Sequence, residues 1–249
     1  MTPVGRVVEI VRYPVKSMAG IAAETAELGW HGLEGDRRFA FRRRDDGSGF
    51  PWLSASRLPE LLLYRPDGVE ENGGEPLPTH VRTPEGSRLA LGSPELDTEI
   101  GDRLGSPVEL MRLRQGVFDE APISVIAVAT IEGIAREAGR ELDRRRFRSN
   151  VVVDTGGGEP FLEDAWIGGT LLFGDSEAPA AVSVTMRDPR CAMINLDPDT
   201  AERDARVMKA VVRLHGNDAG VYATVVRRGT IRVGDPVRLA APAAVAAVR

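Results

Sequence analysis

The sequence predicts a mainly β fold with a few helices, in which short strands follow one another through tight turns. The 27 Gly and 17 Pro residues are spread along the chain, which is typical of many short strands rather than long helices. Short apolar runs separated by turns continue to residue 239. The last of these runs are joined by tight turns, a pattern that suits the end of a small barrel. We therefore expect a β-barrel-like protein.

Length and charge limit the classes of protein to consider. A chain of 249 residues can form one large domain or two interlocked ones, and it needs no disulfide or metal for stability. The net charge of −5 argues against a nonspecific nucleic-acid binder. The 32 Lys and Arg residues, most of them Arg, still allow a local basic pocket.

The sequence also carries signals about location. Residues 1–12 alternate polar and apolar positions and lack the apolar centre of a signal peptide. No run approaches the roughly 18 apolar residues of a membrane span. A single cysteine fits a reducing compartment. We expect a cytoplasmic protein that has neither a membrane nor a nucleic-acid partner.

The first half of the chain is predicted to contain strands and no helix. An apolar run followed by Pro14 predicts a first strand, and residues 67–78, rich in Gly, Glu and Pro, predict a solvated loop. The predicted strands span residues 4–13, 22–28, 36–42, 79–83, 88–91 and 108–111.

The second half is predicted to add two helices to further strands. Thr130 is a suitable N-cap for a helix over residues 131–139, and an apolar stripe predicts a helix over residues 201–214. Asp188 and Pro189 are expected to break the strand that precedes them. The predicted strands span residues 123–128, 151–153, 169–173, 181–186, 220–226, 231–233 and 236–239, and an Ala/Val tail starts at residue 241.

Cys191 is the only thiol, and it is the first candidate for chemistry. It cannot form an internal disulfide or complete a four-cysteine metal site. It can be a nucleophile, a sulfur carrier or one soft ligand of a metal. The alternative is a buried cysteine that acts as a small apolar residue. Arg190 beside it, just past a strand end, favours thiolate chemistry.

Other candidate residues are cations and hydroxyls near strand ends. Lys16 and Ser17 follow the first strand, where they are either functional or part of a solvated turn. Arg37 is predicted to lie on one face of its strand with two phenylalanines, so that it needs an anionic partner, with Asp36 as the local alternative.

Arg148 and Asn150 form the last candidate pair. In an extended chain they lie on one face and offer a guanidinium fork and an amide to an oxyanion or a heterocycle edge. Gly156, Gly157 and Gly158 lack the spacing and the Lys-Ser/Thr ending of a phosphate-binding loop, and we interpret them as a turn.

Together these residues resemble the MOSC family, named for the C-terminal domain of molybdenum cofactor sulfurase. The N-terminal part is similar to the β-barrel domain that precedes MOSC in the amidoxime-reducing component and its bacterial relatives. The motifs that carry the resemblance are Tyr13-Pro14-Val15-Lys16-Ser17, Gly32-Leu33-Glu34-Gly35-Asp36-Arg37, Leu58-Pro59-Glu60-Leu61, Phe147-Arg148-Ser149-Asn150, Glu163-Asp164-Ala165-Trp166, Arg190-Cys191, Asp197-Pro198-Asp199-Thr200, Gly220-Val221-Tyr222 and 229–236.

The resemblance implies two intimately packed domains, an N-terminal β domain over residues 1–114 and a MOSC domain over residues 115–240, followed by a tail over 241–249. It implies a molybdenum cofactor, a pterin dithiolene with a phosphate, between the domains. Cys191 would be the catalytic thiolate on molybdenum. The residues that match cofactor-holding positions are Lys16, Ser17, Arg37, Arg148, Asn150, Arg190 and Tyr222. A family-level association with pyridoxal phosphate comes with the same resemblance.

The function implied is that of a molybdenum-dependent oxidoreductase that reduces N-hydroxylated small molecules, such as amidoximes. Electrons would come from a separate reductase, because the chain has no flavin or nicotinamide fingerprint and no cysteines for an iron–sulfur cluster. The alternatives are sulfur transfer through a Cys191 persulfide and a non-enzymatic cofactor carrier. Four positions depart from the family pattern: Ser149, Ser56, Pro189 and Ala127.

Overall fold

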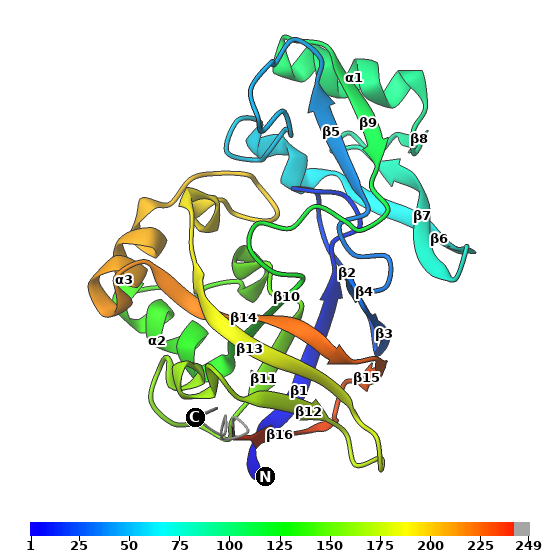
Figure 1. Ribbon diagram of the computed structural model, residues 1–249. Coiled ribbons are helices and arrows are strands. Elements are labelled where there is room, and N and C mark those ends of the chain that lie inside the picture. The colour runs from blue at the N-terminus through cyan, green and yellow to red at the C-terminus, as the bar shows by residue number, and fades with distance from the viewer. Residues whose placement is uncertain (242–249) are drawn as a thin grey trace, which may run out of the picture.

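The protein contains a closed barrel of seven strands, seen in a computed structural model that describes residues 1–241 (Figure 1). The predicted tail over 241–249 lies almost wholly outside the described residues. Every neighbouring pair in the ring is antiparallel except β10 and β11, which run parallel. In ring order the strands are β1 (Thr2–Arg12), β11 (Val151–Asp154), β10 (Ile123–Ala127), β14 (Asp218–Arg227), β13 (Ala180–Pro189), β12 (Thr170–Phe173) and β16 (Pro236–Ala240).

Apolar side chains from alternating strand positions fill the barrel, as the period of two in a strand requires. Val7, Val125, Val151 and Val221 are among the fully buried residues of this core. On the outer surface, α2 (Val128–Ala138) and α3 (Ala205–His215) form a second apolar cluster with the backs of barrel strands. Helix α2 lies in the connection between the parallel strands β10 and β11.

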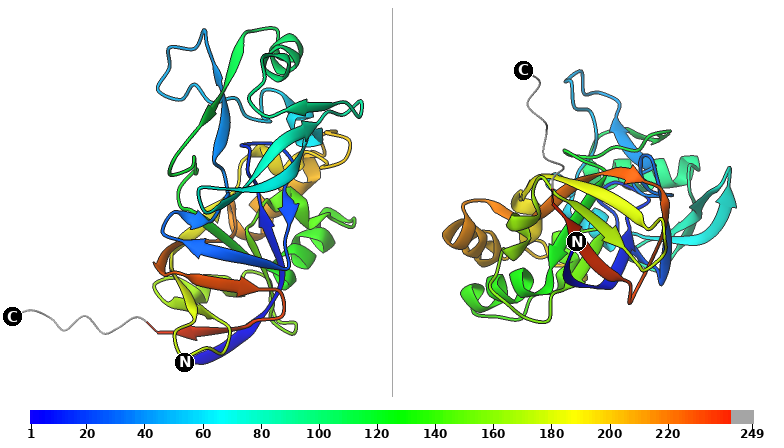
Figure 2. Two further views of the ribbon diagram at one scale, coloured as in Figure 1. Left: turned by 90° about the vertical axis from the view of Figure 1, so that its right-hand side faces the viewer. Right: turned by 60° about the horizontal axis from the view of Figure 1, so that its bottom comes forward.

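A second β unit lies above one end of the barrel, and Figure 2 shows it from two further sides. Its own apolar core includes Phe41, Leu61, Val81 and Leu96. Its elements are β5 (Phe39–Arg43), the 3-10 helix η1 (Pro59–Leu63), β6 (Arg65–Asn72), β7 (Glu75–Arg82), β8 (Arg88–Ala90), α1 (Pro94–Leu104) and β9 (Val108–Arg112). We call this the upper unit.

A sheet of three short strands packs against the barrel core. β15 (Gly229–Arg232) pairs with β3 (Thr25–Gly29), and β3 pairs with β4 (Gly32–Leu33). β2 (Ile21–Ala22) pairs antiparallel with the end of β1. β1 itself, although it lies in the predicted N-terminal domain, closes the barrel between β11 and β16. The boundary after residue 114 therefore stays a prediction that folding experiments have to test.

The mainly β, barrel-like fold with a few helices is confirmed, and the differences are local. Residues 67–78 are a hairpin rather than a loop, because Gly73 and Gly74 take the positive φ values that its tight turn needs. Helix α1 was not predicted, although Ser93 caps it and Gly105 ends it in a left-handed conformation.

Two other predicted details are wrong. Thr130 is not an N-cap but lies inside α2, where its hydroxyl donates to Glu163. The predicted strand over 22–28 is interrupted between β2 and β3. Within residues 1–241, no helix has the length and apolar composition that a membrane crossing requires.

Candidate functional site

The candidate site is a small pocket at the end of the barrel that faces the upper unit. Residues that follow β1, end β13, begin β10, precede β11 and lie in the middle of β14 meet there. The pocket has a volume of about 80 Å³. Its lining includes Lys16, Ser17, Arg37, Asp119, Ser124, Arg146, Arg148, Asp188, Arg190, Cys191, Met193 and Tyr222, and we call it the Cys191 pocket.

Cys191 is exposed at this pocket, so the alternative of a buried apolar thiol is wrong. It follows β13 and precedes the 3-10 helix η4 (Ala192–Asn195). Arg190 beside it is 8% exposed and held rigidly: Nε donates to the carbonyl of Ala219 at 2.7 Å, and Nη1 donates to the carbonyl of Phe147 at 2.6 Å. The residue before the accessible thiol is therefore a cation whose guanidinium is fixed by the barrel end.

Asp188 is a buried carboxylate that sequence reasoning missed. β13 continues through Asp188 to Pro189 instead of breaking before them, and the strand carries this side chain into the pocket. Its Oδ2 accepts a hydrogen bond from Ser124 at 2.6 Å and pairs with Arg190 Nη2 at 2.8 Å. Burial raises the pKa of Asp188, although Arg190 and Ser124 oppose the rise.

Tyr222 lies in β14 opposite Ser124, so its position in the pocket follows from strand pairing. Burial raises the pKa of its phenol, and the carboxylate of Asp188 adds to the effect. Tyr222 thus stays a protonated hydroxyl that can donate a hydrogen bond into the pocket.

Lys16 and Ser17 follow β1 and line the pocket from the side of the upper unit. Lys16 Nζ pairs with Asp119 Oδ1 at 3.0 Å, a carboxylate that the sequence analysis also missed. Burial opposes ionisation of Asp119, but Lys16, Arg37 and Arg148 together lower its pKa.

Arg37 reaches the pocket from a turn and not from a strand. Its φ of 52° is left-handed, and β5 begins only at Phe39, so the predicted shared face with the phenylalanines is wrong. Its Nη1 pairs with Asp36, as the local alternative proposed, and its Nη2 donates to the carbonyl of Arg148 at 3.3 Å. The more deeply buried arginine is Arg38, at 2% exposure.

Arg148 is also left-handed, with a φ of 51°, so the predicted extended chain between it and Asn150 is wrong. Its guanidinium carbon lies 4.2 Å from the centre of the Tyr13 ring, and Nη1 donates to the carbonyl of Met18 at 2.7 Å. Burial lowers the pKa of Arg148 to about 10.

Asn150 lies behind the pocket wall rather than in it. It is 1% exposed, its Nδ2 donates to Asp36 at 3.1 Å, and its Oδ1 accepts from the backbone N–H of Ser124 at 3.2 Å. It therefore positions the residues around it, whereas the other predicted residues line the pocket itself.

The charge balance of the Cys191 pocket singles out one cation. Lys16, Arg37, Arg190 and Arg146 each pair with a carboxylate. Among the described residues, no carboxylate lies within ion-pair distance of Arg148. Because an uncompensated, desolvated cation is costly, Arg148 marks the place where an external anion is best stabilised.

The cations and the thiol of the Cys191 pocket match the chemistry of an anionic group that also binds a thiolate. The volume of the pocket is a poorer match. No cluster of three or more metal-ligating His, Cys, Asp or Glu side chains occurs within residues 1–241, so Cys191 could supply only one ligand of a metal. The pocket is smaller than the roughly 300 Å³ at which ligand pockets begin.

The four departures from the family pattern lie in different surroundings. The Ser149 hydroxyl joins the buried network, 3.2 Å from the Ser124 hydroxyl and 3.4 Å from Arg190 Nη2. Pro189 lines the pocket. Ala127 and Ser56 do not, and the carbonyl of Ser56 instead accepts from Arg203. Only Ser149 adds a polar group near the site.

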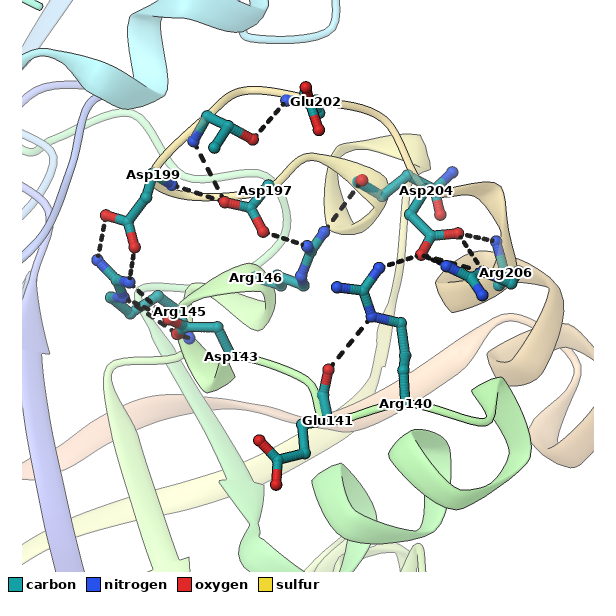
Figure 3. A network of polar contacts seen from close by, with 12 residues as sticks. Arg140, Glu141, Asp143, Arg145, Arg146, Asp197, Asp199, Glu202, Asp204 and Arg206 are labelled. Atoms are coloured by element: carbon teal, nitrogen blue, oxygen red, sulfur yellow. Dashed lines mark hydrogen bonds and ion pairs between the residues drawn. The ribbon is translucent and has the colours of Figure 1, made fainter.

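The segment after Cys191 is fixed by a network of ion pairs, shown in Figure 3. Arg146, whose side chain is 2% exposed, donates to Asp197 at 2.6 Å and to the carbonyl of Asn195 at 3.0 Å. Arg145 Nη2 pairs with Asp143 and Asp199, both at 2.5 Å. We call residues 196–204, together with Asp143, Arg145 and Arg146, the ionic latch. These ion pairs hold the chain beyond Cys191 against the 3-10 helix η2 (Arg144–Phe147).

Comparison with known families and curated proteins gives consistent results. The model of the MOSC domain matches residues 101–238, and that of the MOSC N-terminal beta barrel domain matches residues 4–100. Mitochondrial amidoxime reducing component 2 of Rattus norvegicus is 25% identical over 94% of this chain and 83% of its own length. Molybdenum cofactor sulfurase of Caenorhabditis elegans is 23% identical over 92% of this chain and 34% of its own length.

A solved structure agrees at the level of the fold. The YUAD protein from Bacillus subtilis superimposes with a TM-score of 0.51 at 16% identity, covering 94% of each chain. Mitochondrial amidoxime-reducing component 1 of Mus musculus is 30% identical to this chain, over 49% of this chain and 37% of its own length. The length shared with the relatives therefore ranges from about a third to most of their chains.

Proposed function

This chain belongs to the MOSC family, and from that premise we propose that it binds a molybdenum cofactor at the Cys191 pocket and reduces N-hydroxylated small molecules. The observation that carries the proposal is the exposed Cys191 thiol in the same pocket as Arg148, the cation that has no carboxylate partner among the described residues. A thiolate and an unpaired cation are complementary to a group that has a soft metal at one end and an anion at the other.

Each lining residue would have a distinct part in holding the cofactor. Cys191 would be its protein ligand on molybdenum. Arg148 would pair with its anionic arm, and Arg37, Arg190 and Lys16 would add positive charge. Ser17 and Tyr222 would donate hydrogen bonds, while Asn150 would keep Arg37 and Ser124 in position. When bound, the cofactor would supply two-electron removal of an oxygen atom from the substrate.

The reduction of an N-hydroxyl group to the amine and water also consumes two protons. In its ion pair with Arg190, Asp188 is a carboxylate, and its buried Oδ2 can take up a proton only transiently, while one passes to a substrate. Ser124 bonds to the same oxygen and lines the pocket, so its hydroxyl can relay the proton toward a substrate.

The electrons would come from a separate reductase. With a single cysteine in the sequence, the chain cannot hold an iron–sulfur cluster by itself. The substrate would be a small molecule that reaches the exposed thiol end of the pocket.

Elemental analysis of protein from a host that makes the cofactor tests this proposal. We expect stoichiometric molybdenum and pterin in the wild type, and loss of the metal in Cys191→Ala. Arg148→Gln should lower pterin content while it leaves the thiol reactive. Wild-type protein that contains neither molybdenum nor pterin, or a Cys191→Ala variant that retains the metal in full, would contradict it.

Sulfur transfer is the second candidate, because Cys191 is accessible and lies beside the fixed cation of Arg190. It predicts cyanide-labile sulfur on Cys191 in protein that contains no metal, and a pure carrier predicts bound cofactor without turnover.

If the protein binds pyridoxal phosphate, Lys16 is the lysine in the pocket that could form a Schiff base with it. Borohydride treatment in the presence of that compound should then label Lys16.

A further inference from the structure

A second and larger cavity lies beside the Cys191 pocket. It has a volume of about 330 Å³, which is within the range of small-molecule sites. β1, the segment 19–22, the upper unit and the chain beyond Cys191 all contribute to its wall. Arg146, Arg148 and Met193 line both spaces and therefore form the partition between them. We call it the Tyr13 cavity.

The Tyr13 cavity is mostly apolar, with charged groups on part of its wall. Its apolar lining can pack against a flat or compact hydrocarbon body. The apolar residues are Val11, Tyr13, Ala19, Ile21, Ala22, Leu62, Pro66, Met193, Leu196 and Pro198. The charged residues are Glu9, Arg65, Arg145, Arg146 and Arg148.

All but one of these charged residues are neutralised by a partner. Arg65 pairs with Asp199 at 3.3 Å, and Arg144 pairs with Glu9 at the same distance. Arg145 and Arg146 pair with acids of the ionic latch, as Figure 3 shows. Arg148 again has no carboxylate partner among the described residues.

Arg148 has donors left for a ligand in the Tyr13 cavity. A guanidinium carries five N–H groups. The hydrogen bond from Nη1 to Met18 is the one that the side chain of Arg148 donates within the described residues. The face of the guanidinium lies on the ring of Tyr13, which lines the same cavity, so its edge stays available. An anion there would gain a charge-assisted, partly desolvated pair.

We propose that the Tyr13 cavity is a binding site for a small aromatic carboxylate, which shares Arg148 with the cofactor site and therefore competes with the cofactor for this cation. The ring would pack among Val11, Ile21 and Leu196, and the carboxylate would pair with Arg148. This ligand class follows from the wall: an apolar surface selects the ring, and the single uncompensated cation selects one negative charge. The inference stands without the proposed redox function, since it needs neither Cys191 nor a metal.

Isothermal titration of full-length protein that carries no cofactor with 2-naphthoate tests the inference, with 2-naphthamide as the uncharged analogue of the same shape. We expect saturable binding of 2-naphthoate and at least tenfold weaker binding of 2-naphthamide. Arg148→Gln should remove the difference between the two compounds. No binding of 2-naphthoate, or equal binding of the two by the wild type, would overturn the proposal.

Two further measurements locate the ligand and do not depend on the folding of the Arg148 variant. Ile21→Trp, which fills the Tyr13 cavity, should weaken 2-naphthoate binding at least tenfold. Ile167→Trp, at an exposed isoleucine outside both linings, is the matched control and should bind normally. Protein alkylated at Cys191 with iodoacetamide should bind 2-naphthoate with unchanged affinity. Loss of binding after alkylation, or normal binding by Ile21→Trp, would place the ligand elsewhere and refute the assignment.

Discussion

Three residues that line the Cys191 pocket, Ser17, Arg37 and Arg148, have left-handed φ values of 67°, 52° and 51°. This conformation costs a non-glycine residue of order 1–2 kcal/mol. The cost is local, and the turns it produces direct both guanidinium groups toward Asp36, Tyr13 and the pocket. Strain of this kind concentrates at functional sites.

Asp119 provides a first prediction at this scale. Its carboxylate pairs with Lys16 and faces the cations of the pocket, so it takes the place of an external anion. Asp119→Asn should raise the affinity for inorganic pyrophosphate about fivefold. That factor corresponds to the interaction energy of about 1 kcal/mol that is typical of an exposed ion pair. Titration calorimetry measures the change. Asp67→Asn, on the hairpin of the upper unit, is the control; equal affinity in both variants would count against an anion-blocking role.

Glu163 provides a prediction about pH. It is fully buried, accepts from Thr130 at 2.7 Å, and burial raises its pKa. A carboxyl whose pKa is higher in the folded state binds its proton more tightly there, so its contribution to stability is greatest below about pH 4.3 and declines as pH rises through the folded pKa. The unfolding free energy of the wild type minus that of Glu163→Gln should therefore fall between pH 4.5 and 7.

Urea unfolding at a series of pH values measures that difference. Glu70→Gln, at an exposed position of β6, should show little pH dependence relative to the wild type. A difference for Glu163→Gln that stays constant with pH would contradict the assigned pKa direction.

At the residue scale the sequence predicts which side chains gather better than how they are oriented. Strand ends and family motifs lead to Cys191, Arg190, Lys16 and Arg148, and all of them line one pocket. The left-handed turn at Arg148 has no sequence signal, because arginine shows no preference for that conformation. Asp188 was missed because an Asp-Pro pair was expected to end the strand before it. In the structure β13 includes both residues, and Asp188 lines the pocket.

At the scale of elements, the ionic latch determines where η4 and Cys191 lie. Asp197 supports it in two ways: Oδ2 pairs with the buried Arg146, and Oδ1 accepts from the backbone N–H groups of Asp199 and Thr200. Asp199 itself is about half exposed and pairs only with surface arginines. Asp197 therefore contributes more to the free energy of unfolding than Asp199 does.

Asp197→Asn should lower the free energy of unfolding by about 3 kcal/mol, because it leaves a buried guanidinium without its counter-charge. Asp199→Asn should cost less than about 1 kcal/mol. Chemical denaturation gives both values, and the rate of Cys191 alkylation should rise in Asp197→Asn alone. Similar losses of unfolding free energy in the two variants would show that the ion pair with the buried Arg146 is not what makes Asp197 important for stability.

Element prediction succeeded where the period of apolar residues was clear, as in β10, β11 and β14. It failed where composition outweighed local signals. The sequence of α1 has a capping Ser93, a Pro94 at its first position and a terminal Gly105, which together indicate a helix. The β6–β7 hairpin is rich in Glu and Pro, yet the two glycines at its turn indicate the reversal.

At the scale of the molecule, the barrel depends on residues from both ends of the chain. A protein comprising residues 115–240 lacks β1, so β11 and β16 would have unpaired edges and the core would lose Val7 and Ile10. We expect this fragment not to fold cooperatively, whereas residues 1–240 should. Thermal unfolding followed by circular dichroism checks it. A cooperative transition in the fragment would support a domain boundary at residue 114.

The general architecture was predictable because turn-rich composition and family motifs both point to a β barrel. The place of β1 was not, since the pairing of a strand with partners more than 100 residues away leaves no local trace in the sequence. The Cys191 pocket has the same character. Its lining comes from six separate stretches of chain, and only the closed barrel brings them to one end.

The barrel has an odd number of strands, and for that reason at least one neighbouring pair, here β10–β11, must run parallel. Around a closed ring, strand direction must return to its starting value, so the number of direction reversals has to be even. Seven strands have seven junctions, and at least one of them must keep direction. Strands that keep direction need a crossover, here the segment 128–150 that contains α2. That crossover returns at the pocket end of the barrel, and it delivers Arg148 and Asn150 there. An even-numbered barrel could have closed with hairpins alone and would have had no such returning segment to carry them.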